Sequence, residues 1–405
     1  MNQAESEQII NDMQQAGYSF IKKGNDTDIY IIHTCAVTNT AEKKCLQELR
    51  RIRRSNPTAF VVLAGCAVQS GSRLMKEGCA DLQLGQVEKL KIGKILKKML
   101  PQNCARDAVL KENHPLQHRS RALLNIQTGC NFNCSYCIVP KVRGAPQSRD
   151  FKKIISEAEQ MLTAGYREIV VTGINIGLYN DVHGGLVELL KELAALCKTA
   201  RLRLSSLETS TVEHELIELI AENPPICAFL HCPLQSGSDK ILQAMGRRYS
   251  AKAFNSFIRT AAETVPGIGI GTDIICGFPG ETDEDFQQTC QLVDELPFSN
   301  LHVFPFSPRP ETRAAHLPDR IDEKIIRQRC DHLIKTGTVK RHGFAQSFAG
   351  RKVQVLAEKV QHGRGMGWTA EYLKATVPCT PEQCGQLVDA TVVNVDKDLL
   401  HCRLI

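Results

Sequence analysis

Short apolar runs alternate with amphipathic stretches over the first hundred residues. Three runs have the length and apolar content of buried strands: Ile29–Ile32, Phe60–Leu63 and Asp81–Leu84. The residues Asn39–Glu42 resemble a capping box and predict a helix start between the first two runs. Apolar residues at helical spacing follow both there and after the third run: Cys45, Leu46, Leu49 and Ile52, then Ile92, Ile95, Leu96 and Met99. This alternation predicts a small parallel sheet covered by helices over residues 1–104.

A polar stretch with two prolines, at residues 101 to about 119, has the composition of a linker. A longer series of strand and helix patterns follows it. The expected strands are Leu123–Gln127, Glu168–Thr172, Arg201–Ser205, Ala228–Pro233, Gly269–Cys276 and Leu301–Phe304. The amphipathic helices between them include Lys152–Ala164, Gly185–Cys197 and Asp283–Glu295. Residues 116–345 are therefore expected to form a partial (βα)6 barrel, whose chemistry sits at the C-terminal ends of the strands.

The pattern changes again near residue 346. β-rich, partly alternating runs are separated by Gly and Pro turns: Lys352–Val360, Trp368–Val377 and Leu387–Val395. About 60 residues of this kind can close into a small β-barrel, so residues 346–405 are expected to form a third domain. The predicted fold class is α/β throughout, with this barrel appended.

Composition excludes several classes of protein. The 405 residues are 42% hydrophobic and 23% charged, which is typical of a globular protein of about two to three domains. No apolar run approaches the roughly 20 residues that cross a bilayer, and the first residues do not have the charged-then-apolar pattern of a secretory leader, so neither membrane insertion nor secretion is expected. The 17 cysteines are then expected to be reduced thiols of a cytoplasmic protein, some of them metal ligands. The net charge of +6 permits a nucleic-acid partner without requiring one.

Three cysteines on one short loop carry the strongest chemical signal. Cys130, Cys134 and Cys137 follow the first strand of the expected barrel with C-x3-C-x2-C spacing. Three thiolates this close suit a 4Fe-4S cluster and leave one iron open to a further ligand. A zinc site would need a fourth protein ligand, and no His or Cys follows within the loop. We therefore favour the cluster over zinc or over buried cysteines without a ligand.

This triplet, with Tyr136 before its last cysteine, resembles the signature of the radical S-adenosylmethionine superfamily. The resemblance implies that the open iron binds the amino and carboxylate groups of S-adenosylmethionine. One-electron reduction would then release a 5′-deoxyadenosyl radical, which abstracts a hydrogen atom from the substrate.

Two further cysteines occupy matching places in the first block. Cys35 follows the first strand and Cys66 follows the second, at the edge where ligands bind to open α/β sheets. Taken alone, either Cys35 or Cys66 would be interpreted as a small buried residue, which is common for cysteine. As a pair at equivalent strand ends, they are predicted to be metal ligands.

Five segments together resemble the methylthiotransferase family: His33–Thr38, Ala64–Gln69, the cysteine triplet, Leu234–Asp239 and Gly271–Thr282. His302–Ser307 is most similar to the MtaB type of the family, and the last block resembles the RNA-binding TRAM module. The resemblance implies methylthiolation at carbon 2 of N6-threonylcarbamoyladenosine beside the tRNA anticodon. It also implies an electron donor protein, and related members act on isopentenyladenosine or on a ribosomal-protein aspartate.

The family resemblance implies a second, auxiliary 4Fe-4S cluster held by three cysteines. Asn2–Glu7 matches a stretch that lies just downstream of the first of these cysteines in the family. We therefore expect the sequence to be N-terminally truncated, lacking its first strand and first cysteine, with the auxiliary cluster poorly held or missing. A catalytically silent RNA-binding iron–sulfur protein is then an alternative function. Cys45 could substitute for the missing ligand, but its helical position suits the apolar face better.

Other residues have weaker signals. Gly173, Ser206, Glu208 and Gln235 stand at or near later strand ends, and the resemblance implies cofactor contacts for them. Gly277–Glu281 reads as a turn, with Thr282 and Asp285 capping the next helix. Several basic or aromatic residues could contact RNA but equally suit a solvated face or a core: Arg50, Arg51, Arg53, Arg54, Trp368 and Tyr372. Structural roles are expected for Cys379, Cys384 and Cys402, whereas His231, His302 and His332 are expected to be core or surface histidines rather than ligands.

Overall fold

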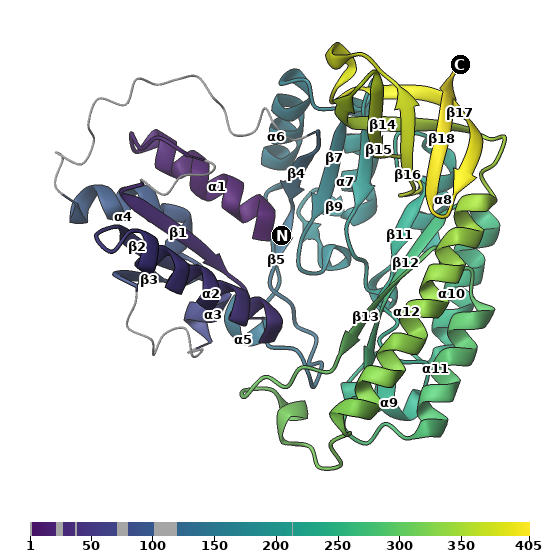
Figure 1. Cartoon of the computed structure of the whole chain (residues 1–405), viewed down its shortest axis with the longest axis horizontal. Helices are drawn as coiled ribbons and strands as arrows, with labels where there is room; N and C mark the ends of the chain where they lie inside the picture. Colours follow the sequence, from purple (N-terminus) through teal and green to yellow (C-terminus); the bar gives the residue numbers. More distant parts are fainter. Residues whose placement is uncertain (1, 22–26, 37–38, 71–79, 101–119, 213) are drawn as a thin grey trace. The chain divides into compact units, whose positions relative to one another are not determined.

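The computed structural model describes residues 2–21, 27–36, 39–70, 80–100, 120–212 and 214–405 (Figure 1). The predicted linker at 101–119 lies outside the described residues, as do the side chains of Asn39 and Thr40 in the expected capping box. The chain divides into two compact units. The first comprises residues 1–118, 129–132 and 137–145, and the second comprises 119–128, 133–136 and 146–405.

The first unit is a parallel three-stranded sheet with helices on both faces. Its strands β1 (Ile29–Thr34), β2 (Phe60–Gly65) and β3 (Leu82–Leu84) lie in that order. On one face, α2 (Asn39–Ser55) buries Leu49 and Ile52 against alternate strand residues such as Val61. The opposite face is covered by α1 (Asn2–Gln15) and α4 (Ile92–Met99). The predicted sheet is confirmed, but Met99 is not part of the apolar face, because its side chain is exposed.

Parallel strands continue in the second unit in two sheets of three. One has the order β10 (Arg201–Leu204), β7 (Glu168–Thr172), β4 (Ala122–Asn125). The other has the order β11 (Phe229–His231), β12 (Gly269–Cys276), β13 (Asn300–Pro305). All six strands fall where the sequence predicts them, with ends shifted by up to two residues.

Helices cover the apolar side of these sheets (Figure 1). They are α6 (Phe151–Thr163), α7 (Leu186–Leu196), α8 (His214–Glu222), α10 (Ala251–Thr264), α11 (Asp283–Glu295) and α12 (Glu323–Gln346). Outward-facing strand residues such as Ile169, Leu202 and Ile270 are fully buried beneath them. The alternate residues face the other way and include many polar side chains. We call this the polar face of the sheets, and its polar residues include Glu168, Arg201, Arg203, His231, Asp273 and His302.

The last 54 residues of the chain contain a closed five-stranded barrel. Its strands are β14 (Lys352–Gln361), β15 (Arg364–Trp368), β16 (Lys374–Pro378), β18 (Leu399–Leu404) and β17 (Leu387–Asp396), in that order round the barrel. The single run expected at Trp368–Val377 is wrong, because a turn breaks it between β15 and β16. Tyr372 adopts a left-handed φ of 66° in that turn.

An ionic cluster joins this barrel to the polar face. Glu168 accepts hydrogen bonds from Arg201 Nε at 2.7 Å and from Arg203 Nε at 2.8 Å. Both guanidiniums also donate to backbone carbonyls of the barrel segment, Arg201 to Trp368 O and Arg203 to Thr369 O, each at 2.9 Å. Burial alone would raise the pKa of Glu168, but the arginines outweigh it and hold the pKa at about 2. A buried carboxylate therefore holds two arginines that anchor the barrel.

Among the described helices, none has enough length and apolar character to cross a bilayer.

Candidate functional site

The cysteine loop begins directly after β5 (Gln127–Thr128) and ends at α5 (Val139–Arg143). Gly129 opens it with φ of +72°, and a Cβ atom there would lie 2.0 Å from Ala145 O. Only glycine allows this approach, after which the Cys130 N–H donates to Gly144 O at 3.1 Å. Cys130 and Cys137 belong to the first unit, whereas Cys134 belongs to the second.

Hydrogen-bond donors lie beside two sulfur atoms of this loop, those of Cys130 and Cys134. The Phe132 N–H donates to Cys130 Sγ at 3.4 Å. Arg247 Nη1 lies 3.6 Å from Cys134 Sγ. Cysteine thiolates are the ligands of 4Fe-4S clusters, and this loop offers three cysteines. The described cysteines are thiols rather than halves of disulfides. The donor set of the loop therefore fits an iron–sulfur cluster.

Arg247 connects Cys134 to two residues singled out from the sequence. Its guanidinium forms an ion pair with Glu208, just beyond β10. The same group lies 3.4 Å from the Tyr136 hydroxyl and donates through Nε to Tyr249 at 3.0 Å. Burial raises the pKa of Glu208, and the pair with Arg247 offsets part of that rise.

Arg247 was not among the residues predicted from the sequence. The local signal was the Gly246–Arg247 pair at the end of α9 (Asp239–Met245), where Gly246 is the left-handed C-cap. A Cβ atom on Gly246 would lie 3.0 Å from Asn133 O in the cysteine loop. The cap therefore brings the chain close to the loop and places Arg247 beside Cys134.

The other predicted strand-end residues differ in their surroundings. Gly173, after β7, packs tightly, because a Cβ atom there would lie 2.8 Å from Ile176 Cγ2. Ser206, after β10, is exposed. Gln235 is buried with φ of 67°, and its N–H donates to Asp273 O at 2.8 Å, so it extends the pairing of β12. All three follow successive strands at their C-terminal ends.

The Gly277–Glu281 turn is held by its own hydrogen bonds. Glu281 accepts from the Gly277 N–H at 2.8 Å and from Arg329 Nη1 at 2.6 Å. The predicted capping by Thr282 and Asp285 is confirmed, since Thr282 Oγ1 accepts from the Asp285 N–H and the Asp285 carboxylate accepts from the Thr282 N–H. These contacts define a structural role for the turn.

In the first unit, Cys35 and Cys66 follow strand ends that pair with each other. Thr34 and Gly65 are register partners, so the two cysteines begin at the same edge of the sheet. Cys66 Sγ accepts from Gln86 Nε2 at 2.7 Å, and burial raises the pKa of its thiol. Cys45 lies on α2 and packs against the apolar cluster of that face, as its spacing predicts.

A buried ion cluster near Cys66 was also missed. Glu5 accepts from Lys89 Nζ at 2.8 Å and from Arg143 Nη1 at 2.6 Å. Burial would raise the pKa of Glu5, yet these cations hold it at about 2. Glu5 lies in the Asn2–Glu7 stretch that matches the family, but no sequence pattern predicted that Lys89 and Arg143 bind it. The cluster connects α1 and α5 within the first unit.

Several of the residues considered for RNA binding already have partners within the protein. Arg51 pairs with Glu48 at 2.6 Å, and Arg53 pairs with Asp81 at 2.5 Å. The rings of Trp368 and Tyr372 stack on each other with centroids 4.7 Å apart, and the Arg121 guanidinium lies over both. This geometry favours packing over base stacking for the two aromatics. Cys379 and Cys402 are buried as expected for packing residues, but Cys384 is exposed.

Comparison with known proteins identifies the family. Residues 124–293 match the Radical SAM superfamily, and residues 1–85 match the Uncharacterized protein family UPF0004. The chain is 33% identical over 412 residues to the Threonylcarbamoyladenosine tRNA methylthiotransferase MtaB of Bacillus subtilis, covering 97% of this chain and 91% of that protein. It is 34% identical to the MtaB of Thermotoga maritima, covering 92% and 88%. The tRNA-2-methylthio-N(6)-dimethylallyladenosine synthase of Endomicrobium trichonymphae is 32% identical, covering 90% and 87%.

Solved structures support the fold. The radical S-adenosylmethionine methyltransferase TsrM from Kitasatospora setae, with tryptophan and a cofactor analogue bound, superposes with a TM-score of 0.56. The alignment covers 74% of this chain and 70% of that one at 13% identity, so it bears on fold alone. The MtaB matches, at 33–34% identity over more than 90% of this chain, establish the family as well. The chain belongs to the MtaB-type methylthiotransferases of the radical S-adenosylmethionine superfamily.

Proposed function

We propose that this protein inserts a methylthio group at carbon 2 of N6-threonylcarbamoyladenosine, next to the anticodon of a tRNA. Similarity over 97% of the chain to proteins named for this activity carries the proposal. The cysteine loop after β5 supplies the chemistry that such a reaction needs, because carbon 2 of adenine has no proton that an ordinary side-chain base removes.

In this proposal Cys130, Cys134 and Cys137 hold a 4Fe-4S cluster. When bound, the cluster supplies the electron that cleaves S-adenosylmethionine to a 5′-deoxyadenosyl radical. Arg247 donates to the Cys134 sulfur and also contacts Tyr136 and Glu208. Gly129 allows the start of the loop to pack directly against the backbone of Ala145.

S-adenosylmethionine is proposed to lie at the C-terminal ends of the parallel strands. Five residues are assigned to it: Tyr136, Gly173, Ser206, Glu208 and Gln235. Their common position after successive strands supports this assignment, since barrels of this class bind ligands at that end. Tight packing at Gly173 and Gln235 would give the cofactor rigid walls.

The domain assignment supports the choice of partner. We propose that residues 1–104 form the methylthiotransferase N-terminal domain, 116–345 the radical core and 346–405 a TRAM-like module that binds RNA. A closed β-barrel of this size is a common RNA-binding scaffold. The other partners are the tRNA anticodon stem-loop and an electron donor protein.

Among the described residues, the motifs that match the family offer Cys35 and Cys66 to an auxiliary cluster. They share one edge of the first sheet, which supports their pairing as ligands. The family resemblance implies three cysteines, and the matching motifs of this sequence supply two. In the described part of the chain, these motifs therefore supply one thiolate fewer than the family set.

One experiment tests the radical step. Anaerobically reconstituted protein, S-adenosylmethionine and dithionite should yield 5′-deoxyadenosine. The Cys134→Ala variant should yield none, whereas Cys384→Ala, which changes an exposed cysteine outside every motif, should match the wild type. Equal product from the two variants would overturn the cluster assignment.

A second experiment tests the substrate. Transfer RNA from a strain lacking this gene should regain 2-methylthio-N6-threonylcarbamoyladenosine, measured by mass spectrometry, when the gene is restored. Relatives named dimethylallyladenosine synthases match at 32% identity, which favours the isopentenyl analogue as the alternative substrate. Return of 2-methylthio-isopentenyladenosine instead would decide for that substrate. Deoxyadenosine release without either product would favour a radical enzyme that does not transfer sulfur.

A further inference from the structure

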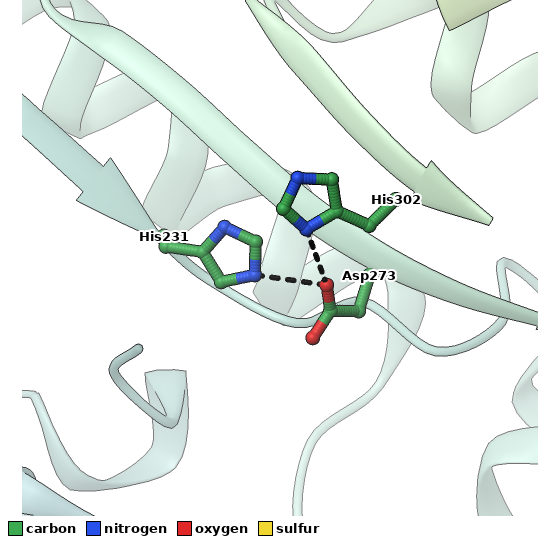
Figure 2. A group of neighbouring side chains, drawn as sticks. All are labelled: His231, Asp273 and His302. Atoms are coloured by element: carbon green, nitrogen blue, oxygen red, sulfur yellow. Dashed lines mark hydrogen bonds and ion pairs between the residues drawn. The ribbon is translucent and has the colours of Figure 1, made fainter. Parts of the chain in front are cut away.

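We propose that His231, Asp273 and His302 form a binding site for a divalent transition-metal ion on the polar face of the sheets. One side chain comes from each of three neighbouring strands, β11, β12 and β13 (Figure 2). The two imidazoles and the carboxylate point toward one another in that view. The proposal does not depend on the substrate or on the cysteine loop.

The donor atoms are already close enough to share an ion. Asp273 Oδ1 lies 2.9 Å from His231 Nε2 and 3.3 Å from His302 Nδ1. All three donor atoms lie within 4.8 Å of one another. Ligands that sit 2.0–2.2 Å from a common ion are separated by roughly 3 to 4 Å, so small side-chain rotations suffice.

The backbone makes this arrangement rigid. Asp273 and His302 are register partners in adjacent parallel strands, and His231 is the partner of Gly271. A Cβ atom on Gly271 would lie 2.7 Å from His231 Nδ1, so glycine leaves the space that this imidazole occupies. Sites built on strands hold their ligands more firmly than sites built on loops.

The chemistry of the donor set selects the ion. Two imidazoles and one carboxylate suit Zn²⁺ or Fe²⁺, whereas Mg²⁺ and Ca²⁺ prefer oxygen ligands. Three protein ligands leave coordination positions for water or a substrate group. The second ring nitrogen of His302 lies 2.9 Å from Asn300 Nδ2, a contact that would orient the ring as outer-shell partners of metal ligands do.

An ion can reach the site. His302 has a side chain 49% exposed, while His231 is 11% exposed, so the site is open on one side and enclosed on the other. Phe304, on the same side of β13, is also exposed. The other charged groups of the polar face, Glu168 and its arginines, pair with each other and leave Asp273 to the two histidines.

Zinc binding by the full-length, cluster-loaded protein tests the proposal. The chelator-washed protein is dialysed anaerobically against Zn²⁺, bound metal is counted by mass spectrometry, and zinc-edge X-ray absorption identifies the donors. We expect a zinc ion with nitrogen and oxygen donors only. His302→Gln changes an exposed residue, so this variant should fold. Loss of an outer-shell partner weakens metal affinity by up to about 100-fold, and loss of a ligand should cost at least as much. We therefore expect zinc affinity to fall at least about 100-fold in His302→Gln.

A matched control is available on α8. His214 is an exposed histidine beside a carboxylate, Glu218, but with no third donor in the described part of the chain, so His214→Gln should bind zinc as the wild type does. Zinc bound through sulfur alone would overturn the proposal. Equal zinc binding by His302→Gln and the wild type would also overturn it, and the three residues would then be a hydrogen-bonded group.

Discussion

Arg247 illustrates how one buried charge can hold several parts of a site. Its guanidinium pairs with Glu208 and donates to the Tyr136 hydroxyl. The side chains of Arg247 and Glu208 are both nearly inaccessible to solvent. Removing one member of such a pair leaves the other charged and buried, which costs about 3–5 kcal/mol. The residue therefore serves stability as well as the neighbouring sulfur.

We predict that Arg247→Ala lowers the free energy of unfolding by about 3–5 kcal/mol. Replacing Glu208 with Gln in the same chain should restore part of the loss, because the unpaired carboxylate is gone. Urea unfolding followed by circular dichroism measures both effects. The exposed pair of Lys191 with Glu215 provides the control, and Lys191→Ala should leave the midpoint unchanged. Equal effects of Arg247→Ala and Lys191→Ala would contradict the prediction.

At this scale, sequence reasoning found residues whose signal is local. The three cysteines stand within eight positions, so their spacing alone indicates a cluster. Arg247 lies more than 100 residues from Cys134, and His231, Asp273 and His302 are separated by about 30 to 40 residues each. Only strand pairing brings the last three together, which is why the sequence indicated core or surface histidines rather than ligands.

At the level of the element, the cysteine loop depends on two glycines with nearly the same backbone conformation. Gly129 has φ of +72° and Gly144 has φ of +73°. A side chain at Gly129 would strike Ala145 O, whereas a side chain at Gly144 would meet nothing within 4 Å. A side chain would therefore suffer left-handed backbone strain at both positions, but it would clash with neighbouring atoms only at Gly129.

We predict that Gly129→Ala prevents the loop from closing and removes most of the iron bound by the triplet. Gly144→Ala should carry only the left-handed strain of about 1–2 kcal/mol and keep its iron. Iron assay and the cluster absorption of the reconstituted variants measure this difference. Normal iron in Gly129→Ala would show that the contact with Ala145 can relax.

Strands and helices were predicted well where the period of the pattern is clear. The six parallel strands and α11 fall where their apolar runs place them. The turn between β15 and β16 was missed because the segment 369–373 carries no Gly or Pro, and Tyr372 supplies the left-handed residue instead. Its ring packs on Trp368 and on Phe229, and that packing stabilises a conformation that local propensity does not favour.

At the scale of the second unit, Glu168 couples the strands to the closed barrel. Its pKa of about 2 lies below the value near 4.3 of an unfolded chain, so ionised Glu168 stabilises the folded state. That stabilisation is present above about pH 4.5 and is lost as the pH falls toward 2. Its full size is on the order of 3 kcal/mol.

We predict that Glu168→Gln destabilises the protein at pH 7 and makes its stability less dependent on pH between about 4.5 and 3. Unfolding in urea at several pH values gives both quantities. Glu215→Gln, which alters an exposed carboxylate, should follow the wild-type curve. A Glu168→Gln curve parallel to the wild type would mean that Glu168 does not titrate with folding.

For the whole chain, the cysteine inventory predicts how much iron the protein binds. The triplet offers three thiolates for one cluster of four irons. In the described part of the first unit, the family motifs supply Cys35 and Cys66 at the sheet edge, and two thiolates are too few for a stable second cluster. Cys45 packs partly in the apolar cluster of α2, and its thiol also lies beside Cys35. We therefore predict about four irons per chain after anaerobic reconstitution.

Variants separate the two groups of cysteines. Cys130→Ala should remove nearly all of the iron, whereas Cys66→Ala should leave the count near four, because the thiolates of the first unit hold little iron in this chain. About eight irons in the wild type, falling to about four in Cys66→Ala, would contradict the prediction and show that a third ligand completes the auxiliary site. In that case Cys45→Ala would identify the ligand. Iron that falls with this change assigns the third position to Cys45, whose thiol lies beside Cys35, and iron that does not fall assigns it to another group.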